Sequence, residues 1–388
     1  AAAGRLTASS DFSEAAACEA SFIIVPTPSD RDGAFSNDYV CAALEALGRA
    51  LRARHGYHVV VVTSTVMPGS MDGPVRSTLE RSAERSVGQT LGLAYNPEFV
   101  ALGNVVHDML HPDLLLIGES DERAGALVAS VYEKVCESKP AVRRMNFVNA
   151  ELTKISVNTF VTTKISYANM IADICDRLPG ADADVVAAAI GEDSRIGRKY
   201  LRGAIGYGGP CFPRDNVAFA VLAERLGARA DLARATDAVN EYQVERLFAT
   251  IAARTPPKSR IAVLGLAYKP DTGVIECSQG VMLARWLADA GFSVAVHDPK
   301  AMRSAADALP AVEVARSAED ALKGAALGVI TTPWKEYARI DPQALARAGA
   351  VIDCWRILPA EASQAGAQIV WLGFGPQGES ALSVAAGG

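Results

Sequence analysis

The sequence lacks the long apolar run that a membrane-spanning helix needs. No hydrophobic stretch approaches the ~18 consecutive apolar residues of such a helix. The first residues, AAAGRLT, do not join a charged segment to an apolar one as a secretory signal does. Basic residues are not in excess either, because 38 Lys and Arg stand against 44 Asp and Glu, a formal net charge of −6. We therefore expect neither a membrane nor a nucleic-acid partner.

Metal-ligand spacing is also missing. The 7 cysteines form no CxxC pair and the 5 histidines show no ligand spacing, which argues against a zinc site. An odd number of scattered cysteines favours reduced thiols. We expect a cytoplasmic protein without a bound metal.

Apolar runs of strand length alternate with helical periods over the first 150 residues. The helical periods cover 37–54 and 70–85, which read as crossover helices. The apolar runs are typical of buried parallel strands and cover 21–27, 58–66, 91–95 and 114–118. This alternation predicts a doubly wound sheet.

The pattern then changes to one long helical period over 151–178, which Pro179 and Gly180 end. Further helical segments continue to about residue 254, and a second alternating region follows the stiff linker 255–259. A chain of 388 residues suggests two or three domains. We predict an α/β protein with two Rossmann-like, doubly wound parallel-sheet domains joined by a long central helix and a helical middle domain. Its domains would cover residues 1–149, 150–254 and 255–388.

The most informative segment is 206–215, which reads GYGGPCFPRD. Its glycines let a ligand approach the backbone, and the prolines on both sides of Cys211 stiffen the presentation of the thiol. Asp215 follows four residues later. The alternative is an ordinary Gly/Pro-rich turn with an incidental buried cysteine. The spacing favours a nucleophilic thiol.

This pattern resembles the segment GxGGxCxxKD of the UDP-glucose/GDP-mannose dehydrogenase family, with Arg214 in place of the lysine. The resemblance implies NAD-dependent, four-electron oxidation of the C6 hydroxymethyl of a nucleotide sugar to a uronic acid, for polysaccharide precursor synthesis. In that chemistry Cys211 forms a thiohemiacetal and then a thioester. Asp215 would orient or deprotonate the nucleophile or water.

Other segments resemble further motifs of the family. STVMPG resembles STVPxG, so Thr65 would hold a catalytic water, although it could be an ordinary helix cap. NPEF contains Glu98, a base for thioester hydrolysis, or else a solvated loop residue. The stretch 151–160 resembles AExxKxxxNxY, so Lys154 and Asn158, four apart on one helix face, would stabilise an oxyanion. In isolation they would be a surface pair.

The resemblance also implies residues that hold the ligands. The arginine of RIG, Arg195, would reach a neighbouring subunit's site, which favours a homodimer. The full set of substrate-binding candidates is Arg195, Tyr200, Arg202, Gly208, Tyr268, Lys269 and Arg356. The cofactor-binding candidates are Thr27, Pro28, Ser64, Thr65 and Arg214.

Two departures from the family leave the sugar open. Leu102 stands where many relatives carry a second Glu, and Glu276 stands where an arginine helps to hold the cofactor phosphates. UDP-glucose, an N-acetylated UDP-hexosamine and GDP-mannose all remain candidate substrates. Leu102 favours the N-acetylated UDP-hexosamine more than the other motifs do.

The family's first βαβ unit, with its GxGYVG turn, has no counterpart in the sequence. A literal GxGxxG occurs at 373–378, but no helix can follow it, so a C-terminal strand and turn is the better interpretation. Since a parallel sheet without its central strands leaves apolar edges open, we expect the sequence to be incomplete. Two alternatives stay open: a nucleotide-sugar-binding protein without redox activity, and a hydroxyacid dehydrogenase that needs no thiol.

Overall fold

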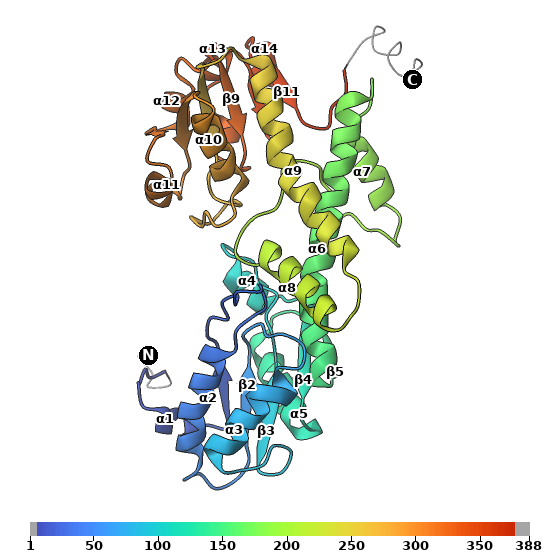
Figure 1. Cartoon of the computed structure of the whole chain (residues 1–388), viewed down its shortest axis with the longest axis vertical. Helices are drawn as coiled ribbons and strands as arrows, with labels where there is room; N and C mark the ends of the chain where they lie inside the picture. The colour runs from blue at the N-terminus through green and yellow to red at the C-terminus, as the bar shows by residue number, and fades with distance from the viewer. Residues whose placement is uncertain (1–5, 377–388) are drawn as a thin grey trace. The chain divides into compact units, whose positions relative to one another are not determined.

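The computed structural model describes residues 6–376 (Figure 1). The chain divides into two compact units, the first built from residues 1–157 and 217–229 and the second from 158–216 and 230–388. Among the described residues, each unit contains one β-sheet. Within residues 6–376, no helix is both long enough and apolar enough to cross a membrane.

The sheet of the first unit has the order β1-β2-β3-β4-β5. Its strands are β1 (Ala20–Ile23), β2 (His58–Val62), β3 (Leu91–Tyr95), β4 (Leu114–Glu119) and β5 (Ala141–Met145). Because side chains alternate along a strand, Val60 and Val62 of β2 enter a core with helices α2 (Asp38–Leu51) and α3 (Arg76–Ala83). Val59 and Val61 enter the opposite core, with α5 (Glu122–Val135). Helices therefore cover both faces, as predicted.

The prediction that all these strands run parallel was wrong for one pair. β3 and β4 are antiparallel, with Ala94 opposite Glu119 and Tyr95 opposite Gly118. A parallel pair needs a crossover of a dozen or more residues, usually through a helix that spans the sheet. The connection, 96–113, is long enough for such a crossover, but its helix is only the short α4 (Val105–Leu110).

The helix predicted over 70–85 is interrupted. A π-helical turn, Met71–Val75, precedes α3, and Gly73 inside it has φ −93° and ψ −111°. Pro74 has no backbone N–H to donate, so a regular helix cannot continue through this point. Short helix α1 (Phe12–Ala17) was not predicted.

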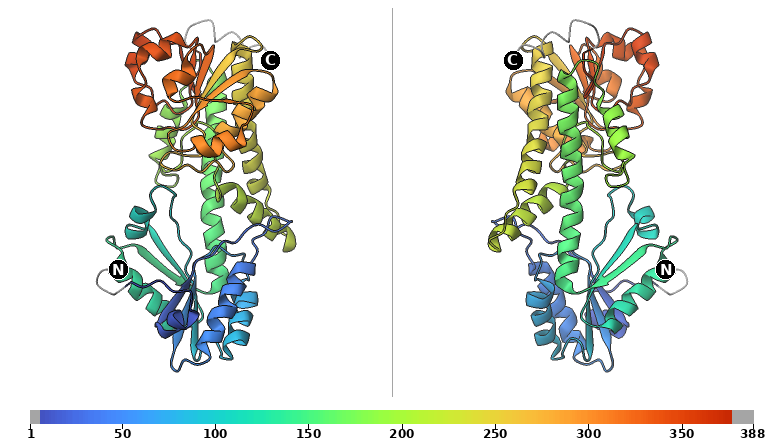
Figure 2. Two further views of the ribbon diagram at one scale, coloured as in Figure 1. Left: turned by 90° about the vertical axis from the view of Figure 1, so that its left-hand side faces the viewer. Right: turned by 90° about the vertical axis from the view of Figure 1, so that its right-hand side faces the viewer.

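The long helix α6 (Phe147–Arg177) begins a little before its predicted start and contributes to both units. In the second unit α9 (Asp231–Arg254) lies along the later part of α6 (Figure 2). Ser166 Oγ donates to the carbonyl of Thr236 at 2.9 Å. Arg246 forms ion pairs with Asp173 and Asp176 of α6. Helices α7 (Ala183–Gly191) and α8 (Phe212–Arg225) complete the middle of the chain.

The sheet of the second unit has the order β11-β10-β9-β6-β7-β8 and is parallel throughout. Its first strand in the chain, β6 (Arg260–Leu264), lies between β7 (Ser293–His297) and β9 (Leu327–Ile330). The strand order therefore reverses at β6, the position where ligands bind in open α/β sheets. The outer strands are β8 (Glu313–Val314), β10 (Val351–Asp353) and β11 (Ile369–Trp371), and the helices are α10 (Gln279–Asp289), α11 (Met302–Ala308), α12 (Ala318–Leu322), α13 (Pro342–Arg347) and α14 (Ala360–Gln364).

Beyond β11, the chain packs against α7 and the end of α6. Ala183 N–H donates to the carbonyl of Gly373 at 2.8 Å, and Gly375 N–H donates to Ala181 at 2.9 Å. A Cβ on Gly375 would come within 2.0 Å of the Leu178 carbonyl oxygen. The described part of the GxGxxG match is thus a turn that packs on helices, and its residues 377–378 lie outside the described residues.

Candidate active site

Cys211 immediately precedes helix α8 and is exposed. The N–H of Asp215 donates to the Cys211 carbonyl at 2.8 Å, so the cysteine is the first residue of a helical turn. The N-terminus of a helix favours negative charge, which suits a thiolate.

Asp215 is the buried centre of a polar group around this turn, with 1% of its surface exposed. Asn158 Nδ2 donates to its Oδ2 at 2.6 Å. The Arg214 guanidinium lies 3.4 Å from its Oδ1. The structure therefore brings together the predicted catalytic residues Cys211, Asn158 and Asp215. Arg214, a predicted cofactor-binding residue, lies against the carboxylate of Asp215.

The glycines of the cysteine loop pack against the segment that follows β6. A Cβ on Gly208 would lie 2.3 Å from the Cys277 carbonyl oxygen, and one on Gly209 would lie 2.5 Å from the Tyr268 ring. Gly209 also has φ +84°, which a residue with a side chain rarely adopts. Burial, with a smaller contribution from the Cys211 thiolate, raises the pKa of Tyr268 to about 12. Tyr268 thus packs against the cysteine loop beside Gly208, and substrate binding by these two residues stays a prediction.

The other substrate-binding candidates are more dispersed. Arg195 pairs with Asp193 at 2.6 Å and leaves 86% of its side chain exposed. Tyr200 is half exposed and has φ 64°. Arg202 Nη2 donates to the carbonyl of Trp355.

Lys269 lies next to Tyr268, with its Nζ 5.9 Å from the centre of that ring. Arg356 is occupied elsewhere, because its guanidinium contacts Asp182 at 2.6 Å and Asp184 at 3.2 Å. The same guanidinium donates to the Leu372 and Gly373 carbonyls at 3.0 Å. In this position Arg356 fastens the C-terminal turn to α7, and substrate binding by it would require these bonds to break.

In the first unit, Lys154 of α6 meets the segment that follows β3. Its Nζ donates to the backbone carbonyl of Glu98 and lies 4.4 Å from the centre of the Phe99 ring. Lys154 is 7% exposed. Two of the predicted catalytic residues are therefore in direct contact, although through the backbone of Glu98.

Thr65 lies in the loop that connects β2 to the π-helical turn. Its neighbour Ser64, a predicted cofactor residue, exchanges two hydrogen bonds with the backbone of Val25, at 2.9 and 2.6 Å. Farther along the loop, the N–H groups of Gly69 and Met71 each donate to Glu151 at 2.7 Å. Glu151 belongs to the motif at 151–160, but nothing in that pattern predicts a role for its carboxylate.

The carboxyl edge of the first sheet has polar atoms that fit the nicotinamide end of a dinucleotide. Thr63 Oγ1 and Asn96 Oδ1, which directly follow β2 and β3, are buried and lack a protein partner. Such unsatisfied groups are costly unless a ligand or water meets them. Thr27, Pro28, Ser64 and Thr65 would hold this end of the cofactor.

The turn after β6 binds the carboxylate of Asp298, which directly follows β7. The N–H groups of Leu266 and Ala267 donate to Asp298 Oδ2 at 2.8 and 2.9 Å. Trp334 Nε1 donates to the same oxygen at 3.0 Å, and Asp298 has no exposed surface.

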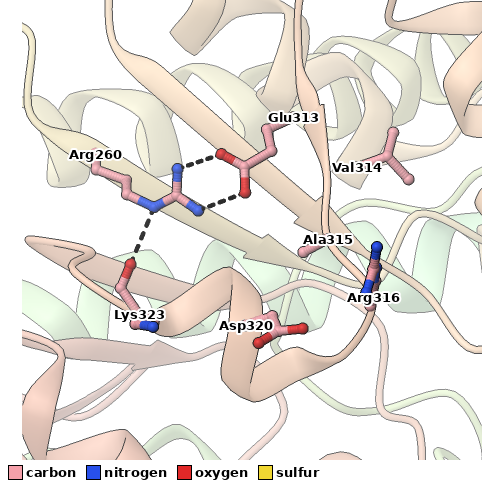
Figure 3. A pocket seen from close by; sticks show the side chains of 7 residues that line it. All are labelled: Arg260, Glu313, Val314, Ala315, Arg316, Asp320 and Lys323. Atoms are coloured by element: carbon pink, nitrogen blue, oxygen red, sulfur yellow. Dashed lines mark hydrogen bonds and ion pairs between the residues drawn. The ribbon is translucent and has the colours of Figure 1, made fainter.

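A surface pocket of about 370 Å³ opens at the amino end of β6, the edge opposite to this turn (Figure 3). Arg260 spans it to Glu313 through two hydrogen bonds and donates a third to the Lys323 carbonyl. None of the predicted site residues lines this pocket.

Three family models match the chain in order. They are the NAD-binding domain of the UDP-glucose/GDP-mannose dehydrogenase family over residues 1–136, its central domain over 148–242 and its UDP-binding domain over 262–360. The chain belongs to this family. The predictions of the family, of an NAD-dependent nucleotide-sugar 6-dehydrogenase and of NAD as cofactor are confirmed.

Individual relatives agree with the family models. The chain is 36% identical to the UDP-glucose 6-dehydrogenase AglM of Haloferax volcanii over 358 residues. This alignment covers 91% of the chain and 83% of the relative. It is 35% identical to the UDP-glucose 6-dehydrogenase of Rhizobium meliloti, over 88% and 78%. The solved UDP-glucose dehydrogenase of Pyrobaculum islandicum superposes with a TM-score of 0.86 at 36% identity, over 96% and 83%.

Proposed function

We propose that the substrate is UDP-glucose and the product its 6-carboxylate, a precursor for polysaccharide synthesis. The support is that three relatives described above, at 35–36% identity, are named for UDP-glucose. The structural neighbour named for UDP-D-ManNAc is 22% identical and supports the fold alone. Leu102 still leaves an N-acetylated UDP-hexosamine as the competing substrate.

The observation that carries the mechanism is Cys211 at the N-terminus of α8, beside the Asn158–Asp215 pair. NAD, when bound, accepts the hydride that leaves C6 in each of the two oxidations. Cys211 Sγ adds to the aldehyde from the first oxidation, and the thiol proton passes through the polar group around Asp215 to the aldehyde oxygen, which becomes the hydroxyl of the thiohemiacetal. The thiohemiacetal hydroxyl then gives its proton to the same polar group as the second hydride leaves C6, which produces a thioester.

Hydrolysis completes the reaction. Glu98 takes a proton from a water that Thr65 orients, the water adds to the thioester carbonyl, and the thiolate of Cys211 leaves. Lys154 supplies a cation and Asn158 an amide donor for the oxyanions that form in these steps. Tyr268, Lys269 and Arg202 hold the nucleotide sugar.

We also propose a homodimer and the division into domains 1–149, 150–254 and 255–388. The ranges of the three family models support the division. For the dimer, Phe160, Tyr167 and Ile174 recur every seven residues on α6 and are 65%, 48% and 51% exposed. Such a spacing places them on one apolar helix face, which a second copy would cover. The exposed Arg195 is available to the partner's site.

The change Cys211→Ser tests the mechanism. A serine hydroxyl is a poor nucleophile at neutral pH, so we expect the first oxidation to continue and acid formation to fall by about 10³-fold or more. Carbonyl-trapping reagent in the assay should capture the aldehyde, and mass spectrometry should identify it. Normal acid formation by Cys211→Ser would exclude the thiol mechanism. Parallel assays with UDP-glucose, UDP-N-acetylhexosamines and GDP-mannose identify the sugar.

A further inference from the structure

The backbone of Tyr207, in the middle of the cysteine loop, is held by a single side chain of α9. Asn240 Oδ1 accepts the N–H of Tyr207 at 2.6 Å, and Asn240 Nδ2 donates to the carbonyl of Tyr207 at 3.0 Å. Both residues are buried, at 8% and 6% exposure. The amide thus satisfies both polar groups of one peptide residue, as a neighbouring β-strand would.

The Tyr207 side chain is held by a second group of polar residues. Its hydroxyl donates to Asp237 Oδ1 at 2.5 Å. Asn216 Nδ2 lies 2.9 Å from both the Tyr207 hydroxyl oxygen and Asp237 Oδ1. Thr162 of α6 donates to Asn216 Oδ1 at 3.1 Å. Burial and the Asp237 carboxylate raise the pKa of Tyr207, so the hydroxyl stays a donor.

This network continues to the thiol through the aromatic ring. The Tyr207 ring meets the Phe212 ring edge-on, with centroids 6.2 Å apart and an interplanar angle of 87°. Phe212 directly follows Cys211. A Cβ on Gly206 would lie 2.4 Å from Asn240 Oδ1, so the present close approach of the loop to α9 requires glycine at this position.

Glycines give a loop more conformations than other residues do, and a reactive thiol needs a single one. We propose that Asn240 and Asp237 of α9 are positioning residues that hold the Cys211 loop, and with it the thiol, at the N-terminus of α8. The role of Cys211 itself rests on the function proposed above. Neither α9 residue contacts the thiol, so each acts through Tyr207.

Alkylation of Cys211 tests this positioning without cofactor or substrate. In the folded full chain at neutral pH, mass spectrometry of the Cys211 peptide gives the iodoacetamide rate, and exposed Cys18 is the internal reference. We expect Asn240→Ala and Asp237→Ala to slow alkylation by about threefold or more, because a thiol displaced from the α8 N-terminus loses its anion-stabilising amides. With NAD and UDP-glucose, kcat for acid formation should fall about tenfold or more while KM changes little.

Two variants serve as controls. Asp237→Asn keeps the acceptor for Tyr207 and should restore near-normal alkylation, whereas Glu245→Ala changes an exposed residue of the same helix and should have no effect. Circular dichroism confirms that each variant is folded. A folded Asn240→Ala protein with an unchanged or faster Cys211 rate overturns the proposal, as does an Asp237→Asn protein as slow as Asp237→Ala. If Cys211→Ser formed acid normally, the mechanism would fail, yet the alkylation rates would still measure the loop.

Discussion

Glu151 is a carboxylate without exposed surface whose two oxygens accept the N–H groups of the loop after Thr65. Burial raises the pKa of Glu151 from 4.5 to about 7, and the hydrogen bonds from Gly69 and Met71 only partly oppose this effect. Because the folded pKa lies above the unfolded one, the folded state binds the proton more tightly. The stabilising contribution of Glu151 protonation to the unfolding free energy is complete below pH 4.5 and is lost as the pH rises through 7.

We therefore expect Glu151→Gln to change how stability depends on pH. The shift corresponds to about 3 kcal/mol between pH 4.5 and pH 8, which the wild type loses and the glutamine variant does not. Urea unfolding at pH 5, 6, 7 and 8 measures the difference. The unfolding free energy of Glu151→Gln, relative to that of the wild type, should increase as the pH rises.

Glu133→Gln is the matched control, because Glu133 is an exposed glutamate on α5. Its unfolding free energy should run parallel to that of the wild type across the same range. Parallel curves for Glu151→Gln as well would contradict the assignment of a raised pKa to Glu151.

At this scale the sequence predicted residues that lie inside long motifs. Cys211, Asp215 and Asn158 were predicted together and are in fact in contact or on adjacent turns. Asp237 and Asn240 were not predicted, since they fall in an ordinary helical segment and their role depends on a loop some thirty residues away. Such a contact arises from tertiary packing and leaves no local pattern.

At the scale of elements, the turn formed by residues 372–376 depends on close approach to the helices beneath it. Gly373 has φ +72°, and a Cβ there would lie 2.7 Å from the Ala183 Cβ. Gly324 has the same φ of +72° but nothing within 4 Å of its Cβ position. The two glycines therefore separate backbone strain from steric contact.

We expect Gly324→Ala to cost about 1–2 kcal/mol, the price of left-handed backbone with a side chain. Gly373→Ala should cost at least about 1 kcal/mol more, since it adds overlap with α7 to the same strain. Thermal or urea unfolding of both variants gives the comparison. Equal losses would mean that the turn does not pack tightly on α7.

The strands were easier to predict than their directions. β3 was predicted at its observed bounds, because a short apolar run between turns identifies a buried strand. The antiparallel direction of β4 could not be predicted from that run, since direction depends on the length and course of the connection. Pro74 indicates the break before α3, but the helical period of the surrounding residues led to the prediction of one continuous helix.

At the scale of the whole molecule, the exposed apolar face of α6, formed by Phe160, Tyr167 and Ile174, leads to a prediction about dimer formation. Replacing Phe160 and Ile174 together with Glu places two charges on the face that a second copy would cover. We expect sedimentation equilibrium to show half the wild-type mass, because buried unpaired charges oppose association. Val106→Glu, at a site 73% exposed on α4, should leave the mass unchanged. A wild-type chain that is monomeric at all concentrations would exclude the dimer.

The carboxylate at the turn after β6 has a consequence for how the two sheets divide their ligands. Asp298 is a competitor attached to the same chain, so its effective concentration at the Leu266 and Ala267 amides far exceeds that of any dissolved phosphate, about millimolar or less. A dinucleotide phosphate would have to displace this carboxylate from the two amides, and the buried charge of Asp298 would lose two of its hydrogen bonds. The second sheet thus keeps the topology of a cofactor domain, while a carboxylate of its own chain already occupies two amides of the turn where a dinucleotide phosphate would bind.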